Sequence, residues 1–223
     1  MNRLKLLKRL APGVVLATAL AGPALAFDGV TDRPGDFLAT FAGSAASLDL
    51  DVLAATVTYD TATDIFTFTS TQAGAVGLTP SGLYVWGVNR GAGAASFAAN
   101  GITGVLFDRV VILRPDGTGA IGATALPAGS VVISGNTISA TVSGSLLPST
   151  GFAKGNYTFN LWPRDGSLPA GFSQIADFAP DNANFTATAV PEPGSLALMS
   201  LGLAGLLWRR RSAALSAAGS PRS

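Results

Sequence analysis

The sequence predicts an all-β fold, an antiparallel β-sandwich or jelly-roll-like domain, with a signal helix before it and a transmembrane helix after it. Three observations support this prediction. Polar and apolar residues alternate with a period of two in several short segments. Glycine, proline, asparagine and aspartate clusters separate these segments. No amphipathic helical pattern lies between them, which favours antiparallel sheets with one wet face.

The predicted strands are short and follow one another closely. A loop of turn-forming residues at 60–64 joins the first two into a hairpin. Pro115 and Gly117 end the fourth strand, since proline presets φ and glycine accepts a positive φ. In a later strand Ile138, Ala140 and Val142 face one way and the serines and threonines between them face the other. The eight predicted strands cover residues 56–59, 65–69, 83–88, 104–114, 131–134, 137–143, 157–162 and 185–189.

The N-terminus has the pattern of a secretory signal peptide. Four basic residues within the first nine positions precede an apolar run from 10 to 25. Ala24 and Ala26 form an A-x-A cleavage site, so signal peptidase is expected to remove residues 1–26 and leave Phe27 first. There is no twin-arginine pair and no cysteine for a lipid anchor. We therefore expect export by the general secretory machinery.

Near the C-terminus, two prolines flank the only glutamate of the chain. The segment reads Val190, Pro191, Glu192 and Pro193. Both prolines lack an N–H and favour extended geometry in the residue before them. Glu192 is therefore expected in an open backbone segment that a protease can bind.

An apolar run from 196 to 208 follows and ends at Arg209, Arg210 and Arg211. A helix that starts at Pro193 would be about 24 Å long at Trp208, somewhat less than the roughly 30 Å of a bilayer core. A tryptophan at the interface and arginines that snorkel can make up the difference. The arginines mark the cytoplasmic side, so the sequence predicts a transmembrane helix with a short cytoplasmic tail at 212–223.

This order of a Pro-flanked acid, an apolar run and a basic cluster resembles the tripartite tail of PEP-CTERM proteins of Gram-negative bacteria. The resemblance implies that residues 190–211 are a sorting signal cut by the membrane protease exosortase. It also implies a transient inner-membrane anchor, final placement at the cell surface or outside the cell, and a link to exopolysaccharide. The remaining residues, 27–189, are then the β-sandwich domain that the tail delivers.

The composition of the domain excludes several kinds of chemistry. Residues 27–189 contain six basic residues against twelve aspartates, a net charge of −6, which does not favour nucleic acid. The chain has no histidine and no cysteine, which excludes Ser-His-Asp and Cys-His catalysis and thiolate or imidazole zinc sites. Lys154, the only lysine of the domain, is expected in a solvated turn. We predict no enzyme activity; a secreted hydrolase with two aspartates remains an alternative.

Three groups of aspartates are candidate calcium ligands, because calcium takes six to eight oxygens from carboxylates and carbonyls. None has the spacing of an EF-hand, and the alternative is that these side chains simply face water at turns and strand edges. No other cofactor is predicted. The groups are Asp28, Asp32 and Asp36, expected in a loop; Asp49 with Asp51; and Asp177 with Asp181.

Tyr84, Trp86 and Trp162 are the candidates for a strip of exposed aromatics that binds polysaccharide. The function predicted from the sequence is an exported surface or matrix protein, associated with exopolysaccharide and not an enzyme. The alternative is a carbohydrate- or calcium-binding, adhesin-like module. A secreted hydrolase is a second alternative.

Overall fold

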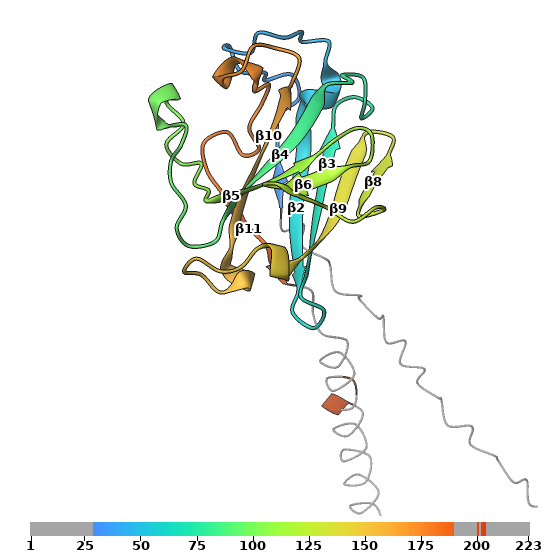
Figure 1. Ribbon diagram of the computed structural model, residues 1–223, viewed down its shortest axis with the longest axis vertical. Coiled ribbons are helices and arrows are strands. Elements are labelled where there is room, and N and C mark those ends of the chain that lie inside the picture. Colours follow the sequence, from blue (N-terminus) through green and yellow to red (C-terminus); the bar gives the residue numbers. More distant parts are fainter. Residues whose placement is uncertain (1–28, 190–199, 201, 204–223) are drawn as a thin grey trace, which may run out of the picture.

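The computed structural model describes residues 29–189, 200 and 202–203, and it shows two β-sheets packed face to face (Figure 1). All strand pairs but one are antiparallel; the exception joins β12 to β2. Residues 29–189 contain no α-helix, only five short 3-10 turns. The predicted all-β, two-layer fold is confirmed.

The first sheet has six strands in the order β1-β2-β3-β9-β8, with β12 alongside β2 on the same edge as β1. The long hairpin of β2 and β3 forms its middle. Its strands are β1 (Val30–Thr31), β2 (Val52–Asp60), β3 (Ile65–Gln72), β8 (Val131–Ser134), β9 (Thr137–Ser143) and β12 (Thr188–Ala189).

The second sheet has six strands in the order β11-β10-β4-β5-β6-β7. The chain changes sheets after β3, β7, β9 and β11, so that β9 pairs with β3 in one sheet and β10 pairs with β4 in the other. The strands are β4 (Gly82–Asn89), β5 (Arg109–Leu113), β6 (Gly119–Ile121), β7 (Thr124–Ala125), β10 (Thr158–Asp165) and β11 (Phe185–Thr186).

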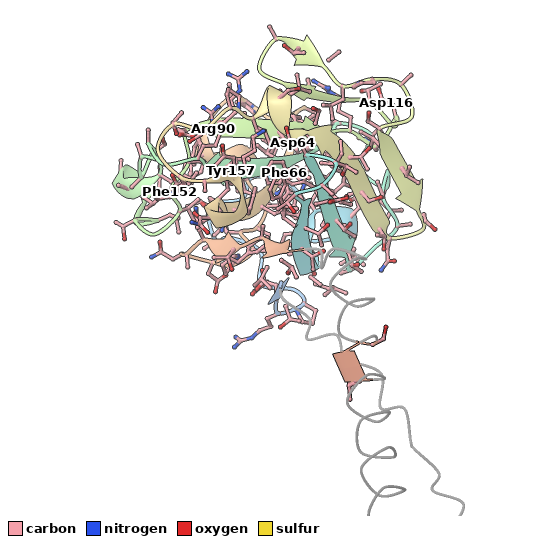
Figure 2. The ribbon with its side chains drawn as sticks, turned by 90° about the horizontal axis from the view of Figure 1, so that it is seen from below. Asp64, Phe66, Arg90, Asp116, Phe152 and Tyr157 are labelled. Atoms are coloured by element: carbon pink, nitrogen blue, oxygen red, sulfur yellow. The ribbon has the colours of Figure 1, made fainter. Side chains whose placement is uncertain are left out.

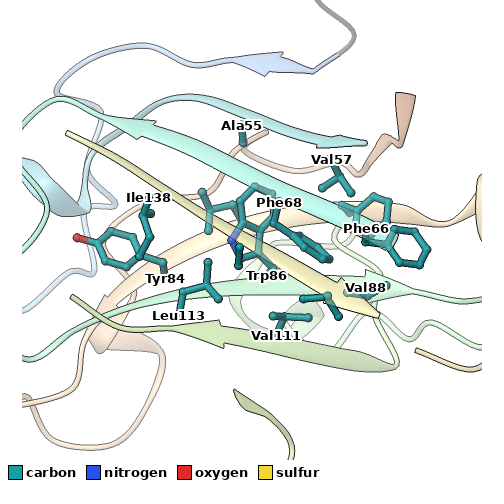
Figure 3. Close-up of a cluster of buried hydrophobic side chains, with 14 of the residues drawn as sticks. Ala55, Val57, Phe66, Phe68, Tyr84, Trp86, Val88, Val111, Leu113 and Ile138 are labelled. Atoms are coloured by element: carbon teal, nitrogen blue, oxygen red, sulfur yellow. The ribbon is translucent and has the colours of Figure 1, made fainter. Parts of the chain in front are cut away.

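The core lies between the two sheets and is rich in aromatic rings (Figure 3). Phe68 on β3 meets Trp86 on β4 edge to face, with ring centroids 5.3 Å apart, and both are fully buried. Phe66 stacks on Tyr157 at 5.7 Å. Burying a side chain of this size contributes about 1.5–3 kcal/mol relative to leaving it exposed. The alternating pattern of β3 places these phenylalanines inward and its threonines on the other face.

The second sheet is covered on its outer face as well. Trp162 of β10 packs there against Phe97 and Phe107 from the segment between β4 and β5, and against Phe178 from the segment after β10. This explains why β4 is buried almost without alternation. The wet face that the alternating pattern predicts is therefore present in the first sheet and largely missing from the second.

Several predicted boundaries differ from the structure. The strand predicted over 104–114 begins only at Arg109, because residues 104–108 instead belong to the covering segment on the outer face. The strand predicted over 185–189 is two short strands in different sheets. The short strands β1, β6 and β7 were not predicted, since two or three residues are too few to show a period.

Most predictions for the two ends of the chain lie outside the described residues. These are the signal cleavage at Ala24, Ala26 and Phe27, the segment Val190 to Pro193, and the arginines 209–211. Within the predicted membrane helix, Ser200, Gly202 and Leu203 are described, and all three are helical. In the described part of the chain, no helix is long and apolar enough to cross a membrane.

Candidate metal centre

Five aspartates from three distant parts of the chain meet at one end of the sandwich. Asp32 and Asp36 lie in the loop after β1, Asp51 lies between the turn η1 (Leu48–Leu50) and β2, and Asp177 and Asp181 follow the turn η5 (Phe172–Gln174). Their carboxylates form two overlapping groups: Asp32, Asp36 and Asp181, and Asp36, Asp51 and Asp177. Within each group, one carboxylate oxygen from each residue lies within 4.8 Å of those from the other two. We call these five residues the acidic cluster.

Backbone hydrogen bonds hold the three segments of the acidic cluster together. Figure 1 shows the blue loop after β1 beside the orange segment around η5, and Leu38 N donates to Ala176 O at 2.8 Å there. Asp177 Oδ2 accepts from Val52 N at 2.9 Å, and Asp51 Oδ2 accepts from Gly35 N at 2.8 Å. These bonds fix the carboxylates of Asp51 and Asp177, and they leave Asp51 Oδ1 without a hydrogen-bond partner.

Three of the carboxylates in the acidic cluster have a buried oxygen without a hydrogen-bond partner. These atoms are Asp32 Oδ2, Asp36 Oδ1 and Asp51 Oδ1. Asp51 and Asp177 are only 2% and 1% exposed. Buried polar atoms are normally paired, so an unpaired carboxylate oxygen in such a place calls for a partner. The ion pairs found among the described residues, Arg90–Asp108 and Lys154–Asp64, lie elsewhere and bring no positive charge to the cluster.

The environment of the acidic cluster opposes negative charge. Burial, with smaller contributions from the carboxylates of Asp32 and Asp36, raises the pKa of Asp177 to about 8. Burial and neighbouring carboxylates likewise raise the pKa of Asp32 to about 6. The pKa of Asp51 is raised for the same two reasons, burial first and Asp36 second. A bound cation would remove this penalty by supplying the missing positive charge.

The prediction that pairs Asp49 with Asp51 in a metal site needs correction. Asp49 belongs to neither group of the cluster, and its carboxylate is already satisfied. It accepts from Thr79 N and Thr79 Oγ1, both at 2.8 Å, and from Gly77 N and Tyr84 Oη, both at 3.3 Å. Asp49 therefore holds the turn before β4. Asp28 lies outside the described residues.

The aromatic candidates for a sugar-binding strip are all buried, which corrects that prediction. Tyr84 and Trp86 are 0% exposed and belong to the core between the sheets. Trp162 is 2% exposed and lies under the outer cover of the second sheet. None of the three can stack on a saccharide in this structure.

Lys154 is not in a freely solvated turn, as the sequence suggests, but in an ion pair. Its Nζ atom lies 2.8 and 2.7 Å from the two carboxylate oxygens of Asp64, which also accepts from Tyr59 Oη at 2.9 Å. Figure 2 shows Asp64 close to Phe66 and Tyr157. The pair joins the β2–β3 hairpin to the turn before β10.

The described residues thus define an all-β sandwich protein with an acidic cluster at one end. Residues 189–211 match the model of the PEP-CTERM protein-sorting motif. The match begins at Ala189, the last residue of β12. No curated protein and no solved structure matches the chain. The resemblance seen in the sequence is confirmed, and the motif implies an exported protein that exosortase processes and sorts to the cell surface.

Proposed function

We propose that this protein is a non-enzymatic component of the cell surface or extracellular matrix, delivered by exosortase and associated with exopolysaccharide. The sorting motif at 189–211 carries the proposal. It starts at the last residue of the sandwich, so cutting near Glu192 would release the folded domain with almost no added tail.

The tail would anchor the protein in the membrane, and the domain would act after its release. Before cutting, the apolar run from 196 to 208 tethers the sandwich to the outer side of the inner membrane, and the arginines stay in the cytoplasm. After cutting, the acidic domain leaves the membrane. Signal peptidase acts earlier, at Phe27, during passage through the general secretory machinery.

The chemistry of the described residues supports a non-enzymatic role. The chain lacks histidine and cysteine, and Lys154 is engaged by Asp64. A cleft of about 400 Å³ beside the loop after β5 is lined by Arg114 and Asp116 among smaller residues, so it offers a single carboxylate. A two-carboxylate hydrolase needs a facing pair of carboxylates at an accessible cleft. This cleft supplies one, and in the acidic cluster Asp51 and Asp177 are buried.

The acidic cluster favours one alternative, a calcium-binding, adhesin-like module. The carbohydrate-binding version of that alternative loses its support, because Tyr84, Trp86 and Trp162 are buried. Polysaccharide association would then depend on surface polar groups rather than on aromatic stacking.

The test is the substitution Glu192→Ala in a host that carries exosortase. We expect full-length protein to remain in the membrane fraction, whereas the parent chain is shortened and released; an immunoblot of the fractions measures both. Ser212→Ala, beyond the motif, is the matched control and should be processed normally. A host without exosortase should retain every version. Release of Glu192→Ala at the parent level would make the tail a plain membrane anchor and end the proposal.

A further inference from the structure

We propose that the acidic cluster binds Ca²⁺, with Asp36, Asp51 and Asp177 as the inner ligands and Asp32 and Asp181 on the outer side. The inference does not depend on the sorting proposal, because it concerns only the sandwich. Its evidence is the geometry, the unpaired oxygens and the charge of the cluster.

The geometry of the inner group fits one calcium ion. Calcium–oxygen distances are 2.3–2.6 Å, so two oxygens on one ion can be at most roughly 4.6–5.2 Å apart. One carboxylate oxygen from each of Asp36, Asp51 and Asp177 lies within 4.8 Å of the other two. The three side chains can therefore reach a shared ion with little movement. Asp36 also belongs to the outer group and is the residue on which both groups depend.

The buried oxygens point to a ligand independently of the clustering. Asp51 is 2% exposed, and its Oδ2 atom is occupied by Gly35 N while Oδ1 has no hydrogen-bond partner. Asp36 Oδ1 and Asp32 Oδ2 are buried and unpaired in the same way. Carboxylates elsewhere in the domain, such as Asp49, have their oxygens satisfied by protein donors. Among the described residues, the buried carboxylate oxygens without a partner all belong to the acidic cluster.

The chemistry of the donors selects a hard cation with a high coordination number. All five side chains offer oxygen and none offers nitrogen or sulfur, which disfavours zinc and copper. Calcium accepts six to eight oxygens in irregular arrangements, whereas Mg²⁺ demands near-octahedral geometry and retains several waters. Loops that supply several carboxylates at once, as here, suit Ca²⁺ better.

Calcium would lock together the three segments of the acidic cluster. The loop that carries Asp32 and Asp36 precedes the long strands, and the segment that carries Asp177 and Asp181 follows them, so the ion would join the two ends of the domain. A protein without cysteine has no disulfide for this purpose. Calcium modules outside the cell commonly bind with dissociation constants of about 10⁻⁴–10⁻³ M, so loading would follow export.

The test uses the full-length chain, purified in detergent and stripped with a chelator. Titration calorimetry with CaCl₂ measures binding, and thermal melting with and without CaCl₂ measures the effect on the fold. We expect saturable Ca²⁺ binding and a melting temperature raised by several degrees, since a ligand that binds only the folded state stabilises it. MgCl₂ should bind more weakly. Absence of both heat and shift with CaCl₂ overturns the proposal.

Two variants separate a metal site from a purely structural cluster. Asp36→Asn and Asp51→Asn should each weaken Ca²⁺ binding roughly tenfold or more, because each removes a charged ligand. Without metal, both variants should melt at or above the parent temperature, because repulsion among buried carboxylates falls. Asp116→Asn, in an exposed turn near the edge of the molecule in Figure 2, removes the same charge and should leave binding unchanged. Parent-like affinity in either cluster variant would show that the ion binds elsewhere and refute the site.

Discussion

Asp177 Oδ2 accepts a hydrogen bond at 2.9 Å from the backbone N of Val52, across 125 residues of sequence. Its other oxygen accepts from Phe178 N at 2.7 Å. The carboxylate thus connects the start of β2 to the last long segment of the domain, in a place where burial and neighbouring aspartates raise its pKa to about 8. In the proposed calcium site, a proton and the ion would therefore be alternative partners for this carboxylate.

The stability of the calcium-free protein should fall as the pH rises from 5 to 8. A carboxyl group whose folded pKa exceeds its unfolded value stabilises the fold fully below the unfolded pKa of 3.8, and this stability is lost as the pH passes the folded values of about 6 for Asp32 and about 8 for Asp177. We expect a loss on the order of 5 kcal/mol, since one pKa unit corresponds to about 1.4 kcal/mol, measured by urea unfolding in the presence of a chelator. Millimolar Ca²⁺ should flatten or reverse the trend, because the ion binds the deprotonated form.

The window from pH 5 to 8 isolates the acidic cluster from the other aspartates. Five aspartates outside the cluster have a lowered pKa, because their carboxylates accept hydrogen bonds and two of them also form ion pairs. The stability that these five carboxylates contribute is therefore lost only below about pH 4. A calcium-free unfolding curve that is independent of pH above 5 would contradict the expectation. The residues with lowered pKa are Asp60, Asp64, Asp108, Asp116 and Asp165.

Asp49→Ala should destabilise the protein by about 2–4 kcal/mol without changing its affinity for Ca²⁺. The substitution leaves the N–H and hydroxyl donors of Thr79 and the hydroxyl of Tyr84 without their buried acceptor. Urea unfolding measures the loss, and calorimetry measures Ca²⁺ affinity. Asp36→Asn should do the opposite: it should lower the affinity for Ca²⁺ and leave the stability of the calcium-free fold unchanged or higher. A large fall in affinity for Asp49→Ala would place this residue in the metal site after all.

Gly87→Ala should cost about 1–3 kcal/mol, because the second sheet is packed on both faces. A Cβ atom at this position of β4 would overlap the ring of Trp162 and lie 3.2 Å from Phe107 Cβ. Thermal or urea unfolding measures the effect. Gly155→Ala is the matched control, since a Cβ there meets no atom within 4 Å, and it should change stability little. Equal effects in the two variants would mean that the outer aromatic layer adjusts freely.

Alternation of polar and apolar residues in the sequence predicts only strands that have one buried and one solvent-exposed face. It finds β2, β3 and β9, whose inward residues are mostly apolar and outward residues mostly polar. The sequence also predicts β4 from its continuous apolar run. It does not show why both faces of β4 are apolar: aromatic residues from loop segments, which have no periodic pattern, cover the outer face. For that reason Trp162, which the sequence presents as a candidate for sugar binding, lies buried beneath Phe97 and Phe107.

The acidic cluster shows a similar limit. The spacing of aspartates indicates three local groups, but only the fold brings Asp36, Asp51 and Asp177 together, because they belong to segments far apart in the chain. Aspartates that are close in sequence can also have different surroundings. Asp49 and Asp51 are two residues apart, but Asp49 accepts a hydrogen bond from Thr79 N and Asp51 accepts one from Gly35 N. By contrast, the sorting motif is a linear signal, and the sequence alone is sufficient to recognise it.

Three arginines end the sorting motif. In the proposed topology, Arg209, Arg210 and Arg211 hold the tail in the membrane until exosortase cuts it, because moving one arginine through the bilayer centre costs about 2.5–3.5 kcal/mol on the mildest scale. Replacing all three with serine should let the tail pass outward uncut, so that full-length protein leaves the membrane fraction. Replacing all three with lysine keeps the charge and should preserve processing at the parent level. Mass spectrometry of the released protein distinguishes cut from uncut chains, and normal cutting of the serine variant would show that the charges are not what retains the tail.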